Sequence, residues 1–117
     1  MATPALILEW LGPEPHHIPP HEFYELNMNN VRRSDAMIAI VDEPSIGLGM
    51  EIGEAIVRNR PLLCIHKQGA RISRLLSGAR DGIGIPVEPY RDLPHAVEIA
   101  TAFIDALSVP ATPTAAA

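Results

Sequence analysis

The chain has 117 residues, the length of one domain. Apolar residues make up 47% and charged residues 20%, a composition that excludes intrinsic disorder of the whole chain. A net charge of −5 argues against a general nucleic-acid-binding protein, and no apolar run approaches the roughly 20 residues of a membrane-spanning helix. No secretory signal pattern opens the chain, and its single cysteine, Cys64, excludes an internal disulfide. We therefore expect one cytoplasmic domain over 1–108 and a flexible, low-complexity tail over 109–117.

The first half of the chain predicts two strands separated by a helix. The apolar run at 5–11 has the length of a strand, and the proline-rich segment 12–20 is typical of a loop. Residues 21–34 show a weak helical periodicity. Residues 36–42 are almost continuously apolar, which indicates a strand buried on both faces, and residues 43–48 turn the chain.

The second half continues this alternation. It predicts a helix at 49–59, a buried strand at 61–66 and a short helix at 71–77. An edge strand at 83–88 and a final helix at 92–107 follow. Pro86 weakens the edge strand, and Asp92 is the expected N-cap of the last helix. Strands that alternate with helices predict an α/β fold with a mostly parallel sheet. Ligands bind beyond the carboxyl ends of such strands, which directs attention to the loop after 36–42.

That loop combines groups suited to an anionic ligand. Gly47 and Gly49 allow close approach to the backbone, and Ser45 can donate a hydroxyl hydrogen bond. The helix that follows offers unpaired amides at its start, and Glu51, expected in its first turn, could act as a nucleophile. An interpretation without a ligand stays open, in which Ser45 caps the helix and Glu51 interacts with the helix dipole.

A basic segment follows the loop. Between positions 58 and 80 there are six basic residues and no acidic one: Arg58, Arg60, Lys67, Arg71, Arg74 and Arg80. This segment fits either a small anionic ligand or a solvated basic face. The histidines at 16, 17 and 21 are interrupted by prolines and lack an acid or cysteine at zinc spacing, so we expect a surface loop there and no metal.

The stretch 27–79 resembles the nucleoside 2-deoxyribosyltransferase family, and within it most closely the 2′-deoxynucleoside 5′-phosphate N-hydrolase branch. The residues at 44–53, P-S-I-G-L-G-M-E-I-G, match every fixed position of the family pattern P-S-x-G-x-G-x-E-x-G. The segments 34–35, 60–64 and 71–79 resemble the family more loosely. A ten-residue motif in a strand–loop–helix context is fairly specific.

The resemblance implies that Glu51 is the nucleophile that attacks C1′ of a 2-deoxyribosyl 5′-phosphate and displaces the base, leaving a glycosyl-enzyme that water resolves. It implies that Ser45, Ile46, Gly47 and Gly49 hold the 5′-phosphate. Ser73 matches a serine that reaches the neighbouring subunit's phosphate site, which implies a homodimer or a higher homo-oligomer. No cofactor and no nucleic-acid or membrane partner is expected.

Two features depart from the family pattern. The position of a family aspartate that orients or protonates the reacting groups holds Asn27. If an acid is essential, Asp42 or Glu43 would have to substitute for it, or activity would be weak or absent. The chain also begins at the family's second strand, so the expected three-layer sandwich, flavodoxin-like or Rossmann-like, lacks its first strand. Either the first predicted strand pairs directly with 36–42, or another chain fills the gap, or the start is misassigned.

These departures leave three functions open. The first is cleavage of the N-glycosidic bond of a 2′-deoxynucleoside 5′-monophosphate. The second is a nucleotide-binding or sensing protein with a degenerate, non-catalytic site. The third is transfer of the deoxyribosyl group to a second base.

Overall fold

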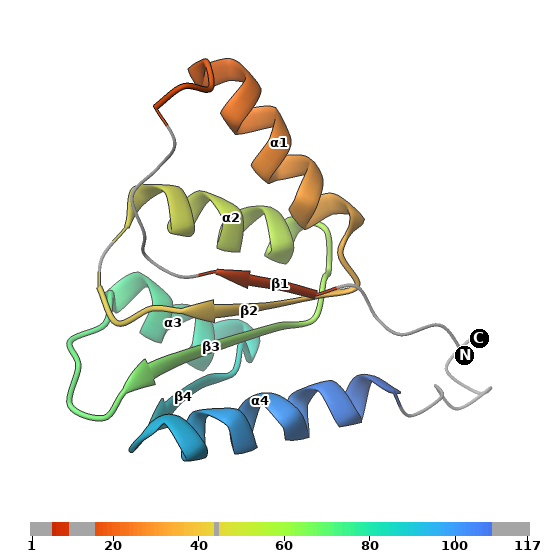
Figure 1. The fold of residues 1–117 in the computed structure, drawn as a ribbon. Helices are drawn as coiled ribbons and strands as arrows, with labels where there is room; N and C mark the ends of the chain where they lie inside the picture. Colours follow the sequence, from red (N-terminus) through yellow and green to blue (C-terminus); the bar gives the residue numbers. More distant parts are fainter. Residues whose placement is uncertain (1–5, 10–15, 44, 109–117) are drawn as a thin grey trace.

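The computed structural model describes residues 6–9, 16–43 and 45–108, so the predicted tail at 109–117 lies outside the described residues. Its centre is a parallel sheet whose strands follow one another in chain order: β1 (Leu6–Glu9), β2 (Ala36–Ile40), β3 (Leu62–Lys67) and β4 (Val87–Tyr90) (Figure 1). β1 pairs directly with β2, with Leu6 opposite Ala36. Of the three possibilities for the opening strand, the structure therefore has direct pairing.

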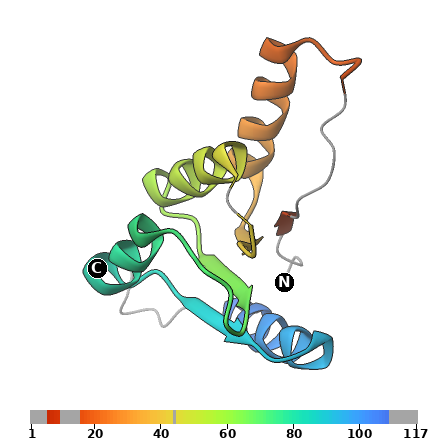
Figure 2. The same cartoon turned by 90° about the vertical axis from the view of Figure 1, so that its left-hand side faces the viewer.

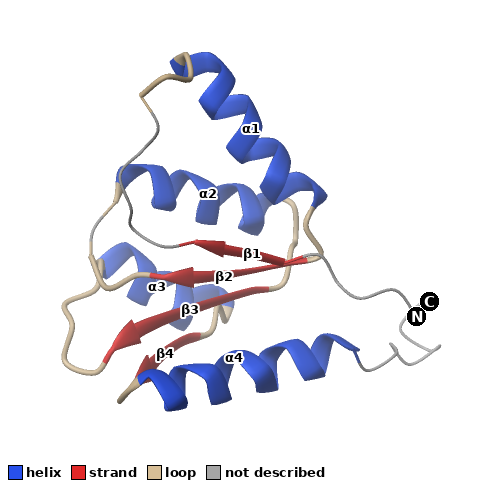
Figure 3. Ribbon diagram, in the orientation of Figure 1, coloured by secondary structure: helices blue, strands red, loops and turns tan. Residues whose placement is uncertain are grey.

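Within the described residues, the sheet is covered by helices α1 (Pro20–Arg33), α2 (Ile46–Val57), α3 (Arg74–Ile83) and α4 (Leu93–Ser108). The three connecting helices, α1 to α3, lie on one face and α4 lies on the other (Figures 2 and 3). Right-handed crossovers that always step to the next strand place every connecting helix on the same face. The α/β three-layer prediction is confirmed, and no described helix combines the length and apolar character needed to cross a membrane.

Two apolar clusters pack against the two faces of the sheet. Met37, Ala39 and Cys64 point to the cluster under α1 to α3, whereas Ile38 and Leu63 point to the cluster under α4. Successive residues of a strand alternate between faces, so a strand covered on both sides is apolar at every position. The central strands were predicted on this ground, and their burial confirms it.

The start of α2 differs from the prediction. The helix begins at Ile46 instead of residue 49, because the Ser45 Oγ accepts a hydrogen bond from the Leu48 amide at 3.2 Å and caps it. Ile46, Gly47 and Leu48 therefore lie inside the helix and not in the preceding turn. Glu51 falls in the second turn, so its expected place in the first turn was wrong.

The following elements are also displaced along the chain. Ser73 caps α3, which starts at Arg74 and continues to Ile83, further than the predicted 71–77. Gly84, with φ of 75°, ends it in the left-handed conformation that glycine adopts without strain. The edge strand consequently begins at Val87 and not at residue 83. Asp92 is the N-cap of α4 as predicted, since its Oδ1 accepts from the His95 amide at 2.9 Å.

The basic segment is divided among several places. Glu54 accepts hydrogen bonds from Arg58 at 2.9 Å and from Arg32 at 3.0 Å. These two bonds, of which the one from Arg58 has the larger effect, hold the pKa of the Glu54 carboxyl below its usual range. The Arg60 guanidinium donates to the Arg32 carbonyl oxygen at the end of α1 at 2.6 Å. Arg58 and Arg60 therefore stabilise the junction of α1 with α2.

Cys64 offers a probe of this core. Its side chain is fully buried, and burial raises the pKa of the thiol from 9.0 to about 11. Because thiol reagents attack the thiolate, modification requires that the fold open first. We expect native Cys64 to react at least about 10³-fold more slowly than in denaturant, as followed by mass spectrometry. Equal rates in the two states would contradict the packing described here.

Candidate active site

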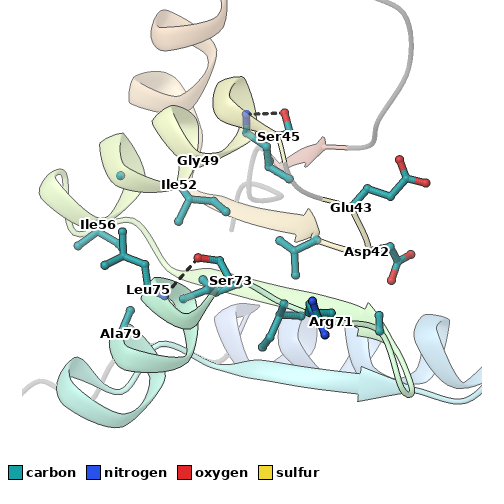
Figure 4. Close-up of a pocket in the computed structure, with 16 residues that line it drawn as sticks. Asp42, Glu43, Ser45, Gly49, Ile52, Ile56, Arg71, Ser73, Leu75 and Ala79 are labelled. Carbon is teal, nitrogen blue, oxygen red and sulfur yellow. Dashed lines mark hydrogen bonds between the residues drawn. The ribbon is translucent and has the colours of Figure 1, made fainter.

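A cavity of about 620 Å³ opens between α2 and α3, beside the carboxyl end of β2. Figure 4 shows α2 on one side of it and, on the other, the segment that leads into α3. Its volume lies within the roughly 300–1,000 Å³ typical of small-molecule sites. The cavity therefore has room for a ligand of mononucleotide size.

The wall of the cavity is mainly apolar, with polar groups gathered at its ends. The apolar lining comes from α2, α3, the residue after β2 and the segment that leads into α3: Val41, Leu48, Ile52, Ile56, Ala70, Ile72, Leu75, Leu76 and Ala79. The polar lining residues are Asp42, Glu43, Ser45, Arg71 and Ser73. This division suits a ligand with a flat apolar part and a charged or hydroxylated part.

Ser45 and Ser73 occupy equivalent positions on the two helices that flank the cavity. Each is an N-cap, with the Ser45 Oγ accepting from Leu48 and the Ser73 Oγ accepting from Leu75, both at 3.2 Å (Figure 4). The cap uses the oxygen as an acceptor and leaves the hydroxyl proton for another partner. Two helix starts and two hydroxyl donors thus border the same cavity, which favours negative charge there.

Asp42 connects the loop after β2 to the two following strands. Its Oδ1 accepts from the Lys67 amide, and its Oδ2 accepts from the Tyr90 hydroxyl at 2.6 Å. The hydrogen bond to Asp42 raises the pKa of Tyr90 above 10.0, because ionised Tyr90 would lose the bond and face a second negative charge. Asp42 therefore fixes the cavity end of the sheet, a role that the sequence did not reveal.

Glu51 lies on a different flank of α2 from the cavity. It is half-buried, with Oε2 shielded from solvent, and it is not among the residues that line the cavity. Residues three apart on a helix share a face, and Glu54, three residues later, meets Arg32 of α1. The Glu51 side of α2 therefore faces α1, whereas Ile52 and Ile56 face the cavity.

The remaining predicted site residues are divided in the same way. Gly49 lines the cavity, and a Cβ added there would meet nothing within 4 Å, so the packing alone does not require glycine. Ile46 is 88% exposed and, like Gly47, contributes a first-turn backbone amide without a partner inside the helix. Asn27 lies on α1, where its amide nitrogen donates to the Phe23 carbonyl oxygen at 2.8 Å.

Arg71 was part of the predicted basic segment but was not singled out as a site residue. It lines the cavity two residues before Ser73, and that proximity in sequence was the available signal. Across the described part of the chain, no three histidine, cysteine, aspartate or glutamate side chains gather as they would around a metal ion.

Comparisons with known proteins place these observations in a family. The chain is 38% identical over 86 residues to a protein of Methanosarcina mazei, and 33% identical over 109 residues to one of Methanosarcina barkeri. Both are named as candidate 2′-deoxynucleoside 5′-phosphate N-hydrolases. A 5-hydroxymethyl-dUMP N-hydrolase of Rattus norvegicus is 32% identical over 71 residues.

These alignments cover 74%, 88% and 59% of this chain and 53%, 68% and 44% of the three relatives, so the chain spans about half to two thirds of their length. The CMP N-glycosidase of Clostridium botulinum is structurally similar, with a TM-score of 0.65 over 74% of this chain and 71% of that one. At 17% identity this similarity supports the fold alone. No family model matches the sequence.

The link between Asp42 and Tyr90 predicts a pH dependence. In a Tyr24→Phe background, which leaves Tyr90 as the one tyrosine, ultraviolet titration is expected to give a pKa above 10.0, and Asp42→Asn is expected to lower it. Because the folded-state pKa is raised, the stability from this bond is complete below pH 10 and is lost as pH rises through that pKa. An unchanged tyrosine pKa in Asp42→Asn would contradict the assignment.

Proposed function

Because this chain belongs to the 2′-deoxynucleoside 5′-phosphate N-hydrolase family, we propose that it hydrolyses the N-glycosidic bond of a 2′-deoxynucleoside 5′-monophosphate. One observation carries this proposal. The two N-cap serines Ser45 and Ser73 border one nucleotide-sized cavity, beside the helix that carries Glu51. The start of α2 thus offers groups that can bind a phosphate, its cavity side offers an apolar surface for a base, and the same helix carries a carboxylate.

The phosphate binds at the start of α2. The amides of Ile46 and Gly47 have no carbonyl partner within the helix, and the Ser45 hydroxyl can donate beside them. The positive end of the helix dipole adds to these hydrogen bonds. Leu48 and Ile52, one turn further along, offer an apolar surface for the base.

Glu51 is the nucleophile. Its carboxylate attacks C1′ of the sugar, the C1′–N bond breaks, and the base leaves with the bonding electrons and takes up a proton. Water then attacks C1′, releases 2-deoxyribose 5-phosphate and restores the carboxylate. Helical side chains lean toward the N-terminus, so Glu51 reaches back toward the first turn of α2, where the phosphate is held.

The active form is a homodimer or a higher homo-oligomer, in which Ser73 also reaches the neighbouring subunit. In support, α2 exposes three large apolar side chains on one side, Ile46, Met50 and Val57. Exposed apolar residues aligned along a helix commonly mark a protein interface. These residues lie on the helix that carries the proposed nucleophile, so association and activity would be linked.

A second candidate function is nucleotide binding without turnover. One observation favours it: Asn27 occupies the place of the family aspartate, and its amide group is hydrogen-bonded within its own helix to Phe23. An amide cannot exchange a proton with the leaving base or the attacking water. The phosphate and base surfaces would remain in such a protein.

Replacement of the nucleophile separates these two candidates. We expect the wild-type protein to release free base from a deoxynucleoside 5′-monophosphate, as detected by chromatography, and Glu51→Gln to lower the rate at least about 10³-fold. Glu54→Gln is the matched control, because it removes a carboxylate one turn further along the same face. Base release that survives in Glu51→Gln would refute the assignment of the nucleophile.

Restoring the acid tests the role of Asn27. Acid–base groups contribute roughly 10²–10⁴-fold to rate, so Asn27→Asp is expected to accelerate base release by about 10²-fold or more. The rate should also acquire a pH dependence that the wild type lacks. An unchanged or lower rate in a folded Asn27→Asp protein would show that this position does not limit turnover.

A further inference from the structure

Resting on the function proposed above, the geometry points to Arg71 as the residue that selects a phosphorylated ligand. Arg71 carries the one positive charge among the described residues that line the cavity. It lies across the cavity from Ser45, on the segment that leads into Ser73 (Figure 4). A guanidinium group offers several donors in one plane and can bind two phosphate oxygens at once.

The carboxylates around the cavity make a cation important for strong binding of an anion there. Asp42 and Glu43 line the same space, so two carboxylates stand against one guanidinium. Asp42 disperses part of its charge into hydrogen bonds from Lys67 and Tyr90, whereas Glu43 is exposed. Without Arg71, a phosphate at this end would face two carboxylates with only neutral donors to offset them.

Other cations of the basic segment have different contacts or positions. Arg58 binds Glu54, Arg60 binds the Arg32 carbonyl oxygen, and Arg80 binds Asp81 at 3.0 Å. Arg74 is exposed at the start of α3 and is not among the residues that line the cavity. The segment that appeared as one basic run in the sequence thus places a single side chain, Arg71, at the cavity.

The test compares Arg71→Met with Arg74→Met, each in a Glu51→Gln background so that bound ligands persist. Titration calorimetry with deoxynucleoside 5′-monophosphates and the matching nucleosides gives two affinities for each protein. Hydrogen bonds to charged groups predict that Arg71→Met weakens monophosphate binding roughly 10- to 100-fold and leaves nucleoside binding nearly unchanged. Arg74→Met should alter neither affinity, and Arg71→Lys should retain part of the selectivity.

Several outcomes would overturn the inference. In the first, Arg71→Met lowers the affinities for monophosphates and nucleosides equally. In the second, Arg74→Met lowers the affinity for monophosphates as much as Arg71→Met does. In the third, the Glu51→Gln protein binds no monophosphate. Thermal unfolding of each variant identifies a loss of affinity that comes from misfolding. If Arg71→Met misfolds, the affinities of Arg71→Lys are compared with those of the Glu51→Gln protein instead. Base release by the wild type tests the proposed function separately, so a catalytic protein with no role for Arg71 would be recognised.

Discussion

The hydrogen bond from the Leu48 amide to the Ser45 hydroxyl oxygen determines where α2 begins, and the rest of the site depends on that start. A helix turns 100° per residue, so within it the direction of one side chain fixes the directions of the others. With Ile46 as the first residue, Ile52 turns toward the cavity and Glu51 toward α1. A start at residue 49 would loosen the first turn and release the amides proposed to bind phosphate.

The edge of the cavity beside the sheet depends on Asp42. Parallel strands bring their carboxyl ends to one edge of the sheet, where Asp42 joins the loop after β2 to Lys67 of β3 and Tyr90 of β4. These bonds hold the entrance to α2 against the sheet. They also leave a carboxylate beside a proposed phosphate site, so the electrostatic balance of the cavity depends on Arg71. Asp42 thus holds the loop against the sheet and also adds the negative charge that Arg71 is proposed to offset.

The sequence predicted the fold well because its signals are local. Unbroken apolar runs identified β2 and β3, and Asp92 correctly marked the start of α4. Helix starts were less certain: glycines at 47 and 49 suggested a loop, but the cap at Ser45 made them helical. The position of Glu51 relative to the cavity could not be predicted, since the cavity is formed between α2 and α3, which come together only in the folded chain.

Placement of the cavity and Glu51 on two flanks of α2 constrains how a substrate binds. In the proposed complex, a ligand that uses both would span the first turn of the helix, with its phosphate and base on the cavity side and C1′ of its sugar turned toward Glu51. A nucleoside has no phosphate to hold it at the first turn of α2 and would keep only the contacts with apolar lining residues such as Leu48, Ile52 and Leu76. In the proposed reaction, phosphate binding would do more than increase affinity, because it would hold C1′ near the carboxylate, so that binding energy far from the reacting bond lowers the barrier.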